Sequence, residues 1–378
     1  MGRRAVRRRQ RRARLALRTS TSGTVTGVTG PSNELRRNPL TGRWVTIASG
    51  RAIRPQDFAT RTLAVEAERT GPCPFCPGNE ELTPPALATY EGSTGGWLVR
   101  VVPNRYPAFD GDGTMRPAVD GVLHQAVHAA GRHEVLVIGP EHEGDLALLD
   151  DERIDVVATA IRERLVAHAA LPQVAYTQAI VNFGREAGAS LEHPHAQLLG
   201  IPFVPLEIDD ELVGFRRFAS ARHDPAVCLL CTTLSVELAA DQRVVEADDD
   251  AVAVAPYWSG APYEMLVVPR VHDPRLHTAP VASLRGVGRL LRTAIHRLHR
   301  VLGDVAYNVV IHTAPHHHDV HYHWHIHLLP RTSTLAGFEQ GTGVLINTMS
   351  PEDATVQLTD AARVGGPPPS GRRTGVAG

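Results

Sequence analysis

The sequence predicts an α+β fold built from one unit that occurs twice, and three observations support this prediction. In each half, an apolar run, a stretch of helical length and a second apolar run follow one another. Each series ends on closely spaced histidines. A Cys-x-x-Cys pair precedes each series, at Cys73 and Cys76 and again at Cys228 and Cys231. Landmarks that recur in the same order indicate a duplication, and one crossover helix among strands is typical of α+β units.

The first unit contains a predicted strand at 134–138, which is followed by His142. A helix is expected over about 145–170, because apolar residues recur there at spacings of three and four. These residues are Leu146, Leu149, Ile154, Val157, Ile161 and Leu165. A second apolar strand at 179–181 leads through a Gly-rich loop to His193-Pro-His195-Ala-Gln197.

The second unit repeats this order. The run that starts at Met265 and ends at His272 mirrors the run from Val135 to His142. A helix is expected near 280–302, with Leu284, Val287, Leu291, Ile295 and Leu298 on one face. A strand at 307–311 follows, and then His323-Trp-His325-Ile-His327. His142 and His193 are 51 residues apart, and so are His272 and His323.

We place the boundary between the units near 201–225, which gives an N-terminal domain at 31–203 and a C-terminal domain at 204–364. Residues 1–30 are expected to form a disordered basic arm, because the first 18 residues include nine arginines and no acid. Such an arm could also touch nucleic acid or anionic lipid. The Gly- and Pro-rich segment 365–378 is expected to be a disordered tail.

The composition of the 378 residues limits the possible functions. Hydrophobic residues make up 43% and the net charge is -1, as in an ordinary soluble protein without a general affinity for nucleic acid. No apolar run approaches the roughly 20 residues that span a bilayer, and the N-terminal segment has no apolar core of a secretory signal. Cysteine pairs in such a chain favour metal binding or redox chemistry over structural disulfides. We therefore expect a cytoplasmic protein without a membrane partner.

Two zinc sites are predicted from the cysteine pairs and the equally spaced histidines. Two cysteines and two histidines are a usual ligand set for tetrahedral zinc. The first site consists of Cys73, Cys76, His142 and His193. The second consists of Cys228, Cys231, His272 and His323. Four protein ligands leave no open position, so both zinc ions would be structural.

The second half offers further histidines, and these leave an alternative open. His321, His323, His325 and His327 would share one face of a strand, because side chains alternate with a period of two. His312, His325 and His327 could hold a different metal, such as iron. The residues 316–318, all histidines, are expected in a solvated loop.

His195 is the predicted nucleophile. On a strand, His193, His195 and Gln197 point the same way, about 6.6 Å apart in steps of two. Zinc on His193 would anchor the strand and leave His195 as a positioned imidazole, which can attack phosphorus. The preceding loop 182–190 is rich in small residues and could bring backbone N–H groups to phosphate oxygens.

The motif His193-x-His195-x-Gln197-Leu-Leu resembles the histidine-triad motif with glutamine in the third position. This variant is typical of the galactose-1-phosphate uridylyltransferase family. The resemblance extends from about 33 to 360. The other motifs that carry it lie at 37–44 (RNPLTGRW), 51–54 (RxxR), 73–80 (CPFCPGNE), 102–107 (VPNRYP) and 337–343 (GFEQGTG).

The resemblance implies two histidine-triad-like units, each an antiparallel sheet with a long crossover helix, and a ping-pong reaction. His195 would attack a UDP-sugar, release hexose 1-phosphate and carry a uridylyl group to a second hexose 1-phosphate, as in galactose metabolism. Gln197 would hydrogen-bond the phosphoryl oxygens. The implied nucleotide-binding residues are Arg51, Arg54, Asn104, Asn182, Gly188 and Ser190. Phe338 and Glu339, and with them Gln340 and Asn347, would bind the sugar of the partner subunit's site in a homodimer.

Some positions depart from the family pattern. Leu191 and Glu192 stand where a second proline is common, and Ala196 replaces a glycine. The second Cys-x-x-Cys and the 337–343 motif resemble the two-zinc branch, which includes ADP-glucose:phosphate adenylyltransferases. Uridine and adenosine donors both stay open for this reason. His325 takes the nucleophile position of the second half without a Gly/Ser loop before it, which indicates a vestigial or structural role.

Three other functions are less well supported. A histidine-triad hydrolase would carry a third histidine where Gln197 stands. A zinc-dependent nucleic-acid-binding protein would use the Cys-x-x-Cys modules and the basic arm, but only 5% of the residues are aromatic. A metal-buffering protein would bind many weak metal ions through the histidine cluster.

Overall fold

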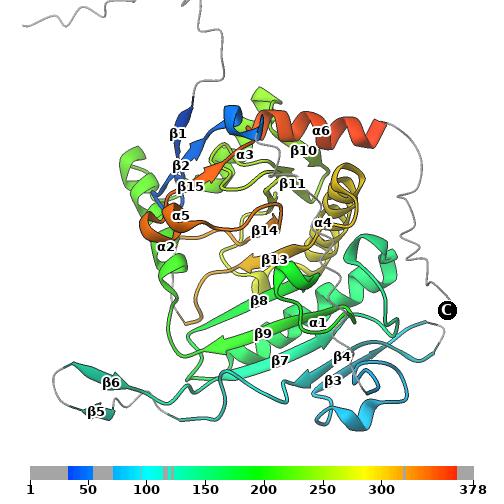
Figure 1. Cartoon of the computed structure of the whole chain (residues 1–378). Helices are drawn as coiled ribbons and strands as arrows, with labels where there is room; N and C mark the ends of the chain where they lie inside the picture. Colours follow the sequence, from blue (N-terminus) through cyan, green and yellow to red (C-terminus); the bar gives the residue numbers. More distant parts are fainter. Residues whose placement is uncertain are drawn as a thin grey trace, which may run out of the picture.

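The computed structural model describes residues 33–53, 71–93, 95–113, 118–120, 123–317 and 321–363. The predicted arm 1–30 and tail 365–378 lie outside these ranges. Within these ranges the strands form three sheets, of three, ten and two strands. Figure 1 shows the large sheet through the centre of the molecule, with the β5–β6 hairpin extending from the body. No helix in the described ranges is both long and apolar enough to cross a lipid bilayer.

The strands have the following bounds: β1 Glu34–Arg37, β2 Trp44–Ile47, β3 Ala88–Glu91, β4 Trp97–Pro103, β5 Ala118–Asp120, β6 His124–Ala126, β7 Arg132–Val137, β8 Tyr176–Phe183, β9 His195–Ile201, β10 Val244–Ala247, β11 Ala251–Val254, β12 Met265–Pro269, β13 Tyr307–His312, β14 His325–Pro330 and β15 Leu345–Asn347. The α-helices are α1 Asp151–Ala169, α2 Leu206–Arg222, α3 Leu229–Ala240, α4 Val281–Leu302, α5 Gly337–Thr342 and α6 Pro351–Arg363. Short 3-10 helices are η1 Ser49–Ile53, η2 Glu80–Leu82, η3 Leu146–Leu148, η4 Arg185–Ala187 and η5 Leu276–Thr278.

The ten-stranded sheet confirms the α+β prediction and shows the repeat directly. Its order is β10-β11-β12-β14-β13-β8-β9-β7-β4-β3. Read outward from the centre, each half contributes five strands in the same order, with β8, β9, β7, β4 and β3 matching β13, β14, β12, β11 and β10. All pairs in this sheet are antiparallel, and β13 pairs with β8 to join the halves.

The two long helices correspond to the predicted crossovers. α4 fits the expected range, and its five predicted apolar residues are all buried. α1 begins at Asp151 rather than near 145, because Asp150 caps it by accepting a hydrogen bond from the Arg153 backbone N–H. The residues before the cap form η3 instead.

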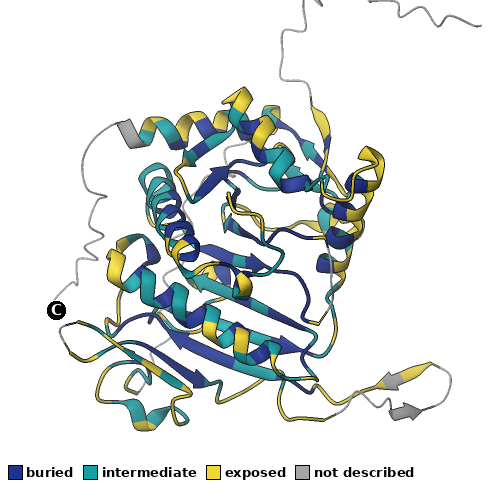
Figure 2. Ribbon diagram, turned by 180° about the vertical axis from the view of Figure 1, so that it is seen from behind, coloured by how far each residue is buried: buried dark blue, intermediate teal, exposed yellow. Residues whose placement is uncertain are grey.

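The faces of the sheet position the functional residues. One face packs against α1 and α4, as the buried side chains of Leu198 and Leu328 show. On the opposite face, α2 and α3 cover the C-terminal strands. The N-terminal strands carry His195 and Gln197 on that second face, because these residues alternate with buried Ala196 and Leu198. Figure 2 shows how burial concentrates on the strands and on the inner sides of the long helices.

A buried ion pair ties α1 to the sheet. Arg164 donates from Nε and Nη2 to the carboxylate of Glu134 at 2.8 and 2.6 Å. The Nε2 of His168 lies 3.0 Å from the same carboxylate. Burial alone would raise the pKa of Glu134, but the contacts with His168 and Arg164 outweigh it and lower the pKa to about 2.

This pair predicts a stability that depends on pH. A carboxyl with a depressed pKa stabilises the fold above its ordinary pKa of 4.5, and this contribution is lost as the pH falls towards about 2. We expect Glu134→Gln to lower the free energy of unfolding at pH 7 by about 3 kcal/mol. Urea denaturation at pH 7 and pH 3 should show a smaller difference from wild type at pH 3. Glu163→Gln is the control, because Glu163 is exposed on α1 and accepts from the Tyr90 hydroxyl rather than from Arg164; an equal loss for Glu134→Gln at both pH values would contradict the ion-pair explanation.

Candidate active site and metal centres

The loop that begins at Cys73 carries two predicted ligands and brings them against His142 and His193. Cys73 and Cys76 approach the Nδ1 of His193 at 3.8 and 3.7 Å, and Cys76 lies 3.3 Å from the Nδ1 of His142. All four ligand atoms lie within 4.8 Å of one another. Phe75 anchors the loop by packing on Val135 and Val137 of the sheet.

The second predicted set forms an equivalent group in the C-terminal half. Cys228 lies 3.6 Å from the Nδ1 of His323, and Cys231 lies 3.7 Å from that of His272 and 3.5 Å from that of His323. These ligand atoms also lie within 4.8 Å of one another. The contact with Cys228, helped by the two histidines, lowers the pKa of Cys231 to about 3, which favours a thiolate.

Both groups fit a tetrahedral zinc ion. Zinc bound to sulfur and imidazole nitrogen places these atoms about 3.5 Å apart, close to the observed separations. In the first group, the Nε2 of His193 donates to the backbone carbonyl of Gly139 at 2.9 Å, which leaves the Nδ1 lone pair for a metal. In the second group, the Nε2 of His323 is buried and has no hydrogen-bond partner among the described residues.

His195 lies at the start of β9 and is 5% exposed. Its Nδ1 is 2.9 Å from the backbone carbonyl of His193. A carbonyl only accepts hydrogen bonds, so this contact places the ring proton on Nδ1 and leaves a lone pair on Nε2. Burial lowers the pKa of His195, which favours the neutral ring.

Gln197 lies two residues further along the same strand and contacts a residue that the sequence analysis missed. Its Oε1 is 3.0 Å from the Nε2 of His133 on β7. Asn104, at the end of β4, also reaches this nitrogen, with its Nδ2 at 3.1 Å. The structure therefore brings Asn104 and Gln197 together around His133. A single histidine in an apolar strand gave no signal for this role.

Asn182 and the loop after it lie on the other side of His195. The Nδ2 of buried Asn308, from the second half, donates to the Oδ1 of Asn182 at 2.7 Å. Arg331 in turn donates to the Oδ1 of Asn308 at 2.5 Å. Since Arg331 can only donate, this chain fixes both carboxamides and leaves the Nδ2 of Asn182 as a donor for a ligand.

The Gly-rich loop differs in part from the expectation. The backbone N–H groups of Ala187, Gly188 and Ala189 donate within the loop, to the carbonyls of Gly184 and Arg185. They are therefore already engaged, which weakens the predicted backbone cradle for phosphate. Gly188 has a φ of +85°, a conformation that favours glycine. The side chain of Ser190 is exposed.

Other predicted ligand-binding residues lie apart from this group. Arg51 is exposed on η1, and Arg54 lies outside the described residues. Phe338 and Glu339 lie on α5, where the carboxylate of Glu339 accepts from the Ala336 backbone N–H. Their recorded contacts within the described ranges do not reach His195. In the same segment, Gln340 donates to the Leu335 carbonyl, and buried Asn347 donates to the Ser259 carbonyl.

A third group of ligand-type side chains lies on the same face in the second half. His312, His325 and His327 surround the carboxylate of Glu211 from α2, with ligand atoms within 4.8 Å of one another. Three imidazoles and a carboxylate suit a divalent transition metal. This group contains the three histidines of the iron alternative, and it is distinct from the second Cys₂His₂ group. Glu211 was missed because it belongs to a helix about 100 residues earlier in the chain.

The strand-face and loop expectations for the second half need correction. His323 turns towards the cysteines, whereas His325 and His327 face Glu211, because β14 begins only at His325. His316 is buried rather than solvated, and its Nε2 lies 2.9 Å from the hydroxyl of Thr177. His317 is exposed as expected, and residue 318 lies outside the described ranges.

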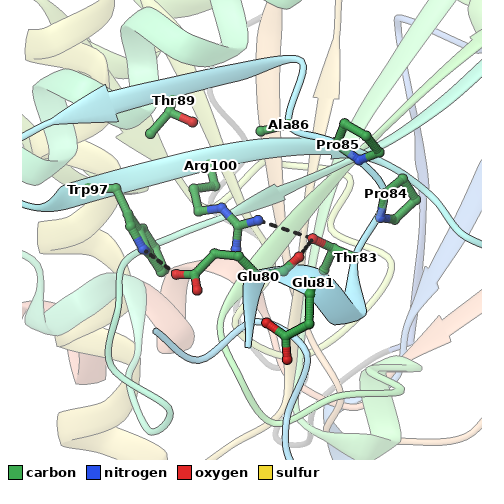
Figure 3. A pocket seen from close by; sticks show the side chains of 9 residues that line it. All are labelled: Glu80, Glu81, Thr83, Pro84, Pro85, Ala86, Thr89, Trp97 and Arg100. Atoms are coloured by element: carbon green, nitrogen blue, oxygen red, sulfur yellow. Dashed lines mark hydrogen bonds between the residues drawn. The ribbon is translucent and has the colours of Figure 1, made fainter. Parts of the chain in front are cut away.

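A surface pocket lies beside the segment that follows the first Cys-x-x-Cys pair. It is lined by Glu80, Glu81, Thr83, Pro84, Pro85, Ala86, Thr89, Trp97 and Arg100. Figure 3 shows Trp97 donating to Glu80 and Arg100 donating to Thr83. None of the predicted catalytic or metal-binding residues lines this pocket. Its polar contacts fix the segment that follows Cys76.

Two family descriptions match the chain. Residues 29–205 match the family described as galactose-1-phosphate uridyl transferase, N-terminal domain. Residues 143–363 match a domain of unknown function, DUF4921.

Named relatives cover most of the chain. ADP-glucose phosphorylase from Arabidopsis thaliana is 30% identical over 340 residues, 89% of this chain and 95% of that protein. Galactose-1-phosphate uridylyltransferase from Thermotoga maritima is 26% identical over 338 residues, 86% of this chain and 98% of that protein.

Solved structures agree with these matches. The crystal structure of ADP-glucose phosphorylase from Arabidopsis thaliana with bound ADP-glucose superposes with a TM-score of 0.75 at 29% identity, and the match covers 87% of this chain and 99% of that one. A structure of uridylyltransferase gives a TM-score of 0.68 at 25% identity, covering 88% and 99%.

Proposed function

Because the chain belongs to the galactose-1-phosphate uridylyltransferase family, we propose that it transfers a nucleoside monophosphate between phosphate acceptors through a covalent intermediate on His195. The observation that carries this proposal is the contact between the Nδ1 of His195 and the carbonyl of His193. This contact directs the Nε2 lone pair away from the backbone, as a nucleophile requires.

The reaction has two balanced steps. In the first, the Nε2 of His195 attacks the α-phosphorus of a nucleoside diphosphate hexose. A nitrogen–phosphorus bond forms, the bond to the bridging oxygen breaks, and hexose 1-phosphate leaves. In the second, an oxygen of the acceptor phosphate attacks the phosphorus and releases His195. The carbonyl of His193 stabilises the positive charge on the ring of the intermediate through the Nδ1–H group.

Nearby polar side chains would hold the substrate. Gln197 and Asn182 would donate to the phosphoryl oxygens next to His195, and Ser190 would add a hydroxyl. Gly188 would allow the loop conformation, and Asn104 would contact the nucleotide. Arg51 and Arg54 would bind the diphosphate. This assignment rests on the family motif and on the placement of Asn182, Gln197 and Asn104 on one face of the sheet.

We propose zinc as the metal of both Cys₂His₂ groups. Cys73, Cys76, His142 and His193 would hold the first ion, and Cys228, Cys231, His272 and His323 the second. Zinc supplies no open coordination position in such sites and acts as a structural anchor. Thiolate ligands of this kind suit a reducing compartment, which supports a cytoplasmic location.

The donor is either a UDP-hexose or ADP-glucose. A UDP-glucose:hexose-1-phosphate uridylyltransferase, with galactose 1-phosphate as acceptor, is the activity that the family name suggests. ADP-glucose with inorganic phosphate is the second candidate. Two observations favour it: the second Cys₂His₂ group, and the TM-score of 0.75 to an ADP-glucose phosphorylase against 0.68 to a uridylyltransferase.

A homodimer would explain the position of Phe338 and Glu339. Their contacts within the described residues are local, so they would serve the sugar site of a second subunit. A monomeric mass in equilibrium sedimentation would contradict this arrangement.

Intact-mass analysis tests the proposal and identifies the donor. The protein is incubated separately with UDP-glucose, UDP-galactose and ADP-glucose, without an acceptor. We expect one of these to add a single nucleoside monophosphate to the chain and to release an equal amount of hexose 1-phosphate. Addition of galactose 1-phosphate or inorganic phosphate should then remove the adduct. No adduct from any of the three donors would overturn the mechanism.

A further inference from the structure

We propose that His133 is a positioning residue of this reaction. It holds the oxygen of the Gln197 carboxamide, so that the NH₂ group of Gln197 faces the phosphate beside His195. This inference rests on the proposed function and assigns a role to a residue outside the His193–Gln197 motif.

The backbone fixes the proton on His133. The N–H of Ala108 donates to the Nδ1 of His133 at 3.1 Å. A backbone N–H can only donate, so Nδ1 carries a lone pair and the neutral ring carries its proton on Nε2. The loop that follows β4 therefore determines which tautomer the sheet presents.

The tautomer of His133 in turn fixes Gln197. The Nε2–H of His133 lies 3.0 Å from Oε1 of Gln197 and donates to it. With its oxygen engaged, the amide can offer only its two N–H groups on the other side. His195 and Gln197 share one face of β9 and are two residues apart. A phosphate on His195 is thus within reach of the donors that Gln197 presents.

Asn104 adds a further donor beside Gln197 without hydrogen-bonding His133. Its Oδ1 accepts from the Tyr106 N–H at 2.9 Å, so its Nδ2 is a donor. This Nδ2 lies 3.1 Å from the Nε2 of His133, but both nitrogens carry hydrogen, so they do not hydrogen-bond each other and the Asn104 NH₂ group needs an acceptor from elsewhere. Around Gln197 the protein therefore gathers more donors than acceptors. Phosphoryl oxygens accept hydrogen bonds only, and they match this arrangement.

The second half does not have an equivalent of the hydrogen bond between His133 and Gln197. By the repeat, His325 corresponds to His195 and His327 to Gln197, and the register of β12 against β14 places Glu264 at the position that His133 takes in the first half. The carboxylate of Glu264 accepts from the backbone N–H of Gly260 at 2.6 Å. His327 faces His325 and Glu211 instead. Among the described residues, a hydrogen bond from the neighbouring strand to the third motif position is found in the half with the proposed nucleophile and not in the other half, which indicates a role in transfer rather than in folding.

A double-mutant cycle tests this role. The variants are His133→Leu, which removes the donor, and His133→Gln, whose amide can replace it; each is made alone and together with Gln197→Ala. The readout is the single-turnover rate of nucleotidylation by the donor that labels wild type. We expect His133→Leu to slow labelling about tenfold, as for one lost hydrogen bond, and His133→Gln to recover most of the rate. Combined with Gln197→Ala, neither His133 variant should slow labelling further.

Zinc content and melting temperature show whether each variant is folded. A His133→Leu variant that labels like wild type would overturn the inference. So would an equal slowing by His133→Leu with and without Gln197→Ala, which would indicate an independent role. If His133→Leu does not fold, His133→Asn takes its place in the cycle, because its shorter amide can still accept from the Ala108 N–H but falls short of Gln197; labelling by His133→Asn at the wild-type rate would then overturn the inference. A wild-type protein that no donor labels would overturn the proposed function itself, and this outcome is distinct from an additive cycle.

Discussion

His195→Gly is expected to abolish nucleotidyl transfer, with a loss of at least about 10⁴-fold in rate. Removal of the nucleophile eliminates the covalent step, and binding interactions alone recover little of the lost rate. The side chain of His195 is separate from the first metal group, which uses His193. We therefore expect the zinc content of the variant to equal that of wild type. Steady-state transfer and intact-mass labelling measure the first effect, and elemental analysis measures the second.

Peptide mapping of labelled wild-type protein provides the matched control. His325 has the same contact in the second half, with its Nδ1 2.9 Å from the His323 carbonyl. Its Nε2 faces Glu211 and His327, so we expect no nucleotide on it. An adduct on His325, or loss of zinc from the His195→Gly protein, would contradict the assignment.

Cys73→Ser and Cys228→Ser are expected to separate the two Cys₂His₂ groups. Each variant should lose about one equivalent of zinc, and each should unfold at a lower temperature, because binding of a structural zinc contributes directly to folding. Cys73→Ser should also lose most of the transfer activity, since His193 is joined to His195 through Pro194, just before β9 begins. Cys228→Ser should still form the adduct. Elemental analysis, thermal unfolding and labelling measure the three effects.

The labelling of Cys73→Ser and Cys228→Ser and the metal content of wild type together assign the metal groups. Equal loss of labelling in both would mean that the second group supports the first active site more directly than the fold indicates. A wild-type protein with three metal equivalents would point to the Glu211 group as a further site. One equivalent would contradict zinc binding by one of the two cysteine groups.

The repeat and the nucleophile could be predicted from the sequence because their signals are local. The Cys-x-x-Cys pairs and the 51-residue spacings lie in the printed chain, and period-two alternation places His195 and Gln197 on one face. Periodicity also located α4 well. It placed the start of α1 too early, because the apolar spacing continues through η3 before the Asp150 cap.

Contacts between distant segments could not be predicted in this way. Glu211 meets His312 only through the packing of α2 against the sheet. His133 reaches Gln197 only because β7 and β9 are neighbours, and nothing in a strand sequence names its neighbour. The burial of His316 depends on Thr177, which lies 139 residues away. Each of these contacts requires the register of the sheet, which hydrophobic patterning alone does not supply.

The pairing of β8 with β13 gives the repeat a consequence for the integrity of the chain. These are the innermost strands of the two halves. Each satisfies the backbone N–H and C=O groups that the other would present at the edge of its own half-sheet. Separation of the halves would expose two rows of unsatisfied N–H and C=O groups on long apolar strands, the type of edge at which proteins aggregate. The halves therefore protect each other from self-association. The C-terminal half has no proposed nucleophile, but it covers the edge strand of the half that does, which gives a reason for the two halves to stay on one chain.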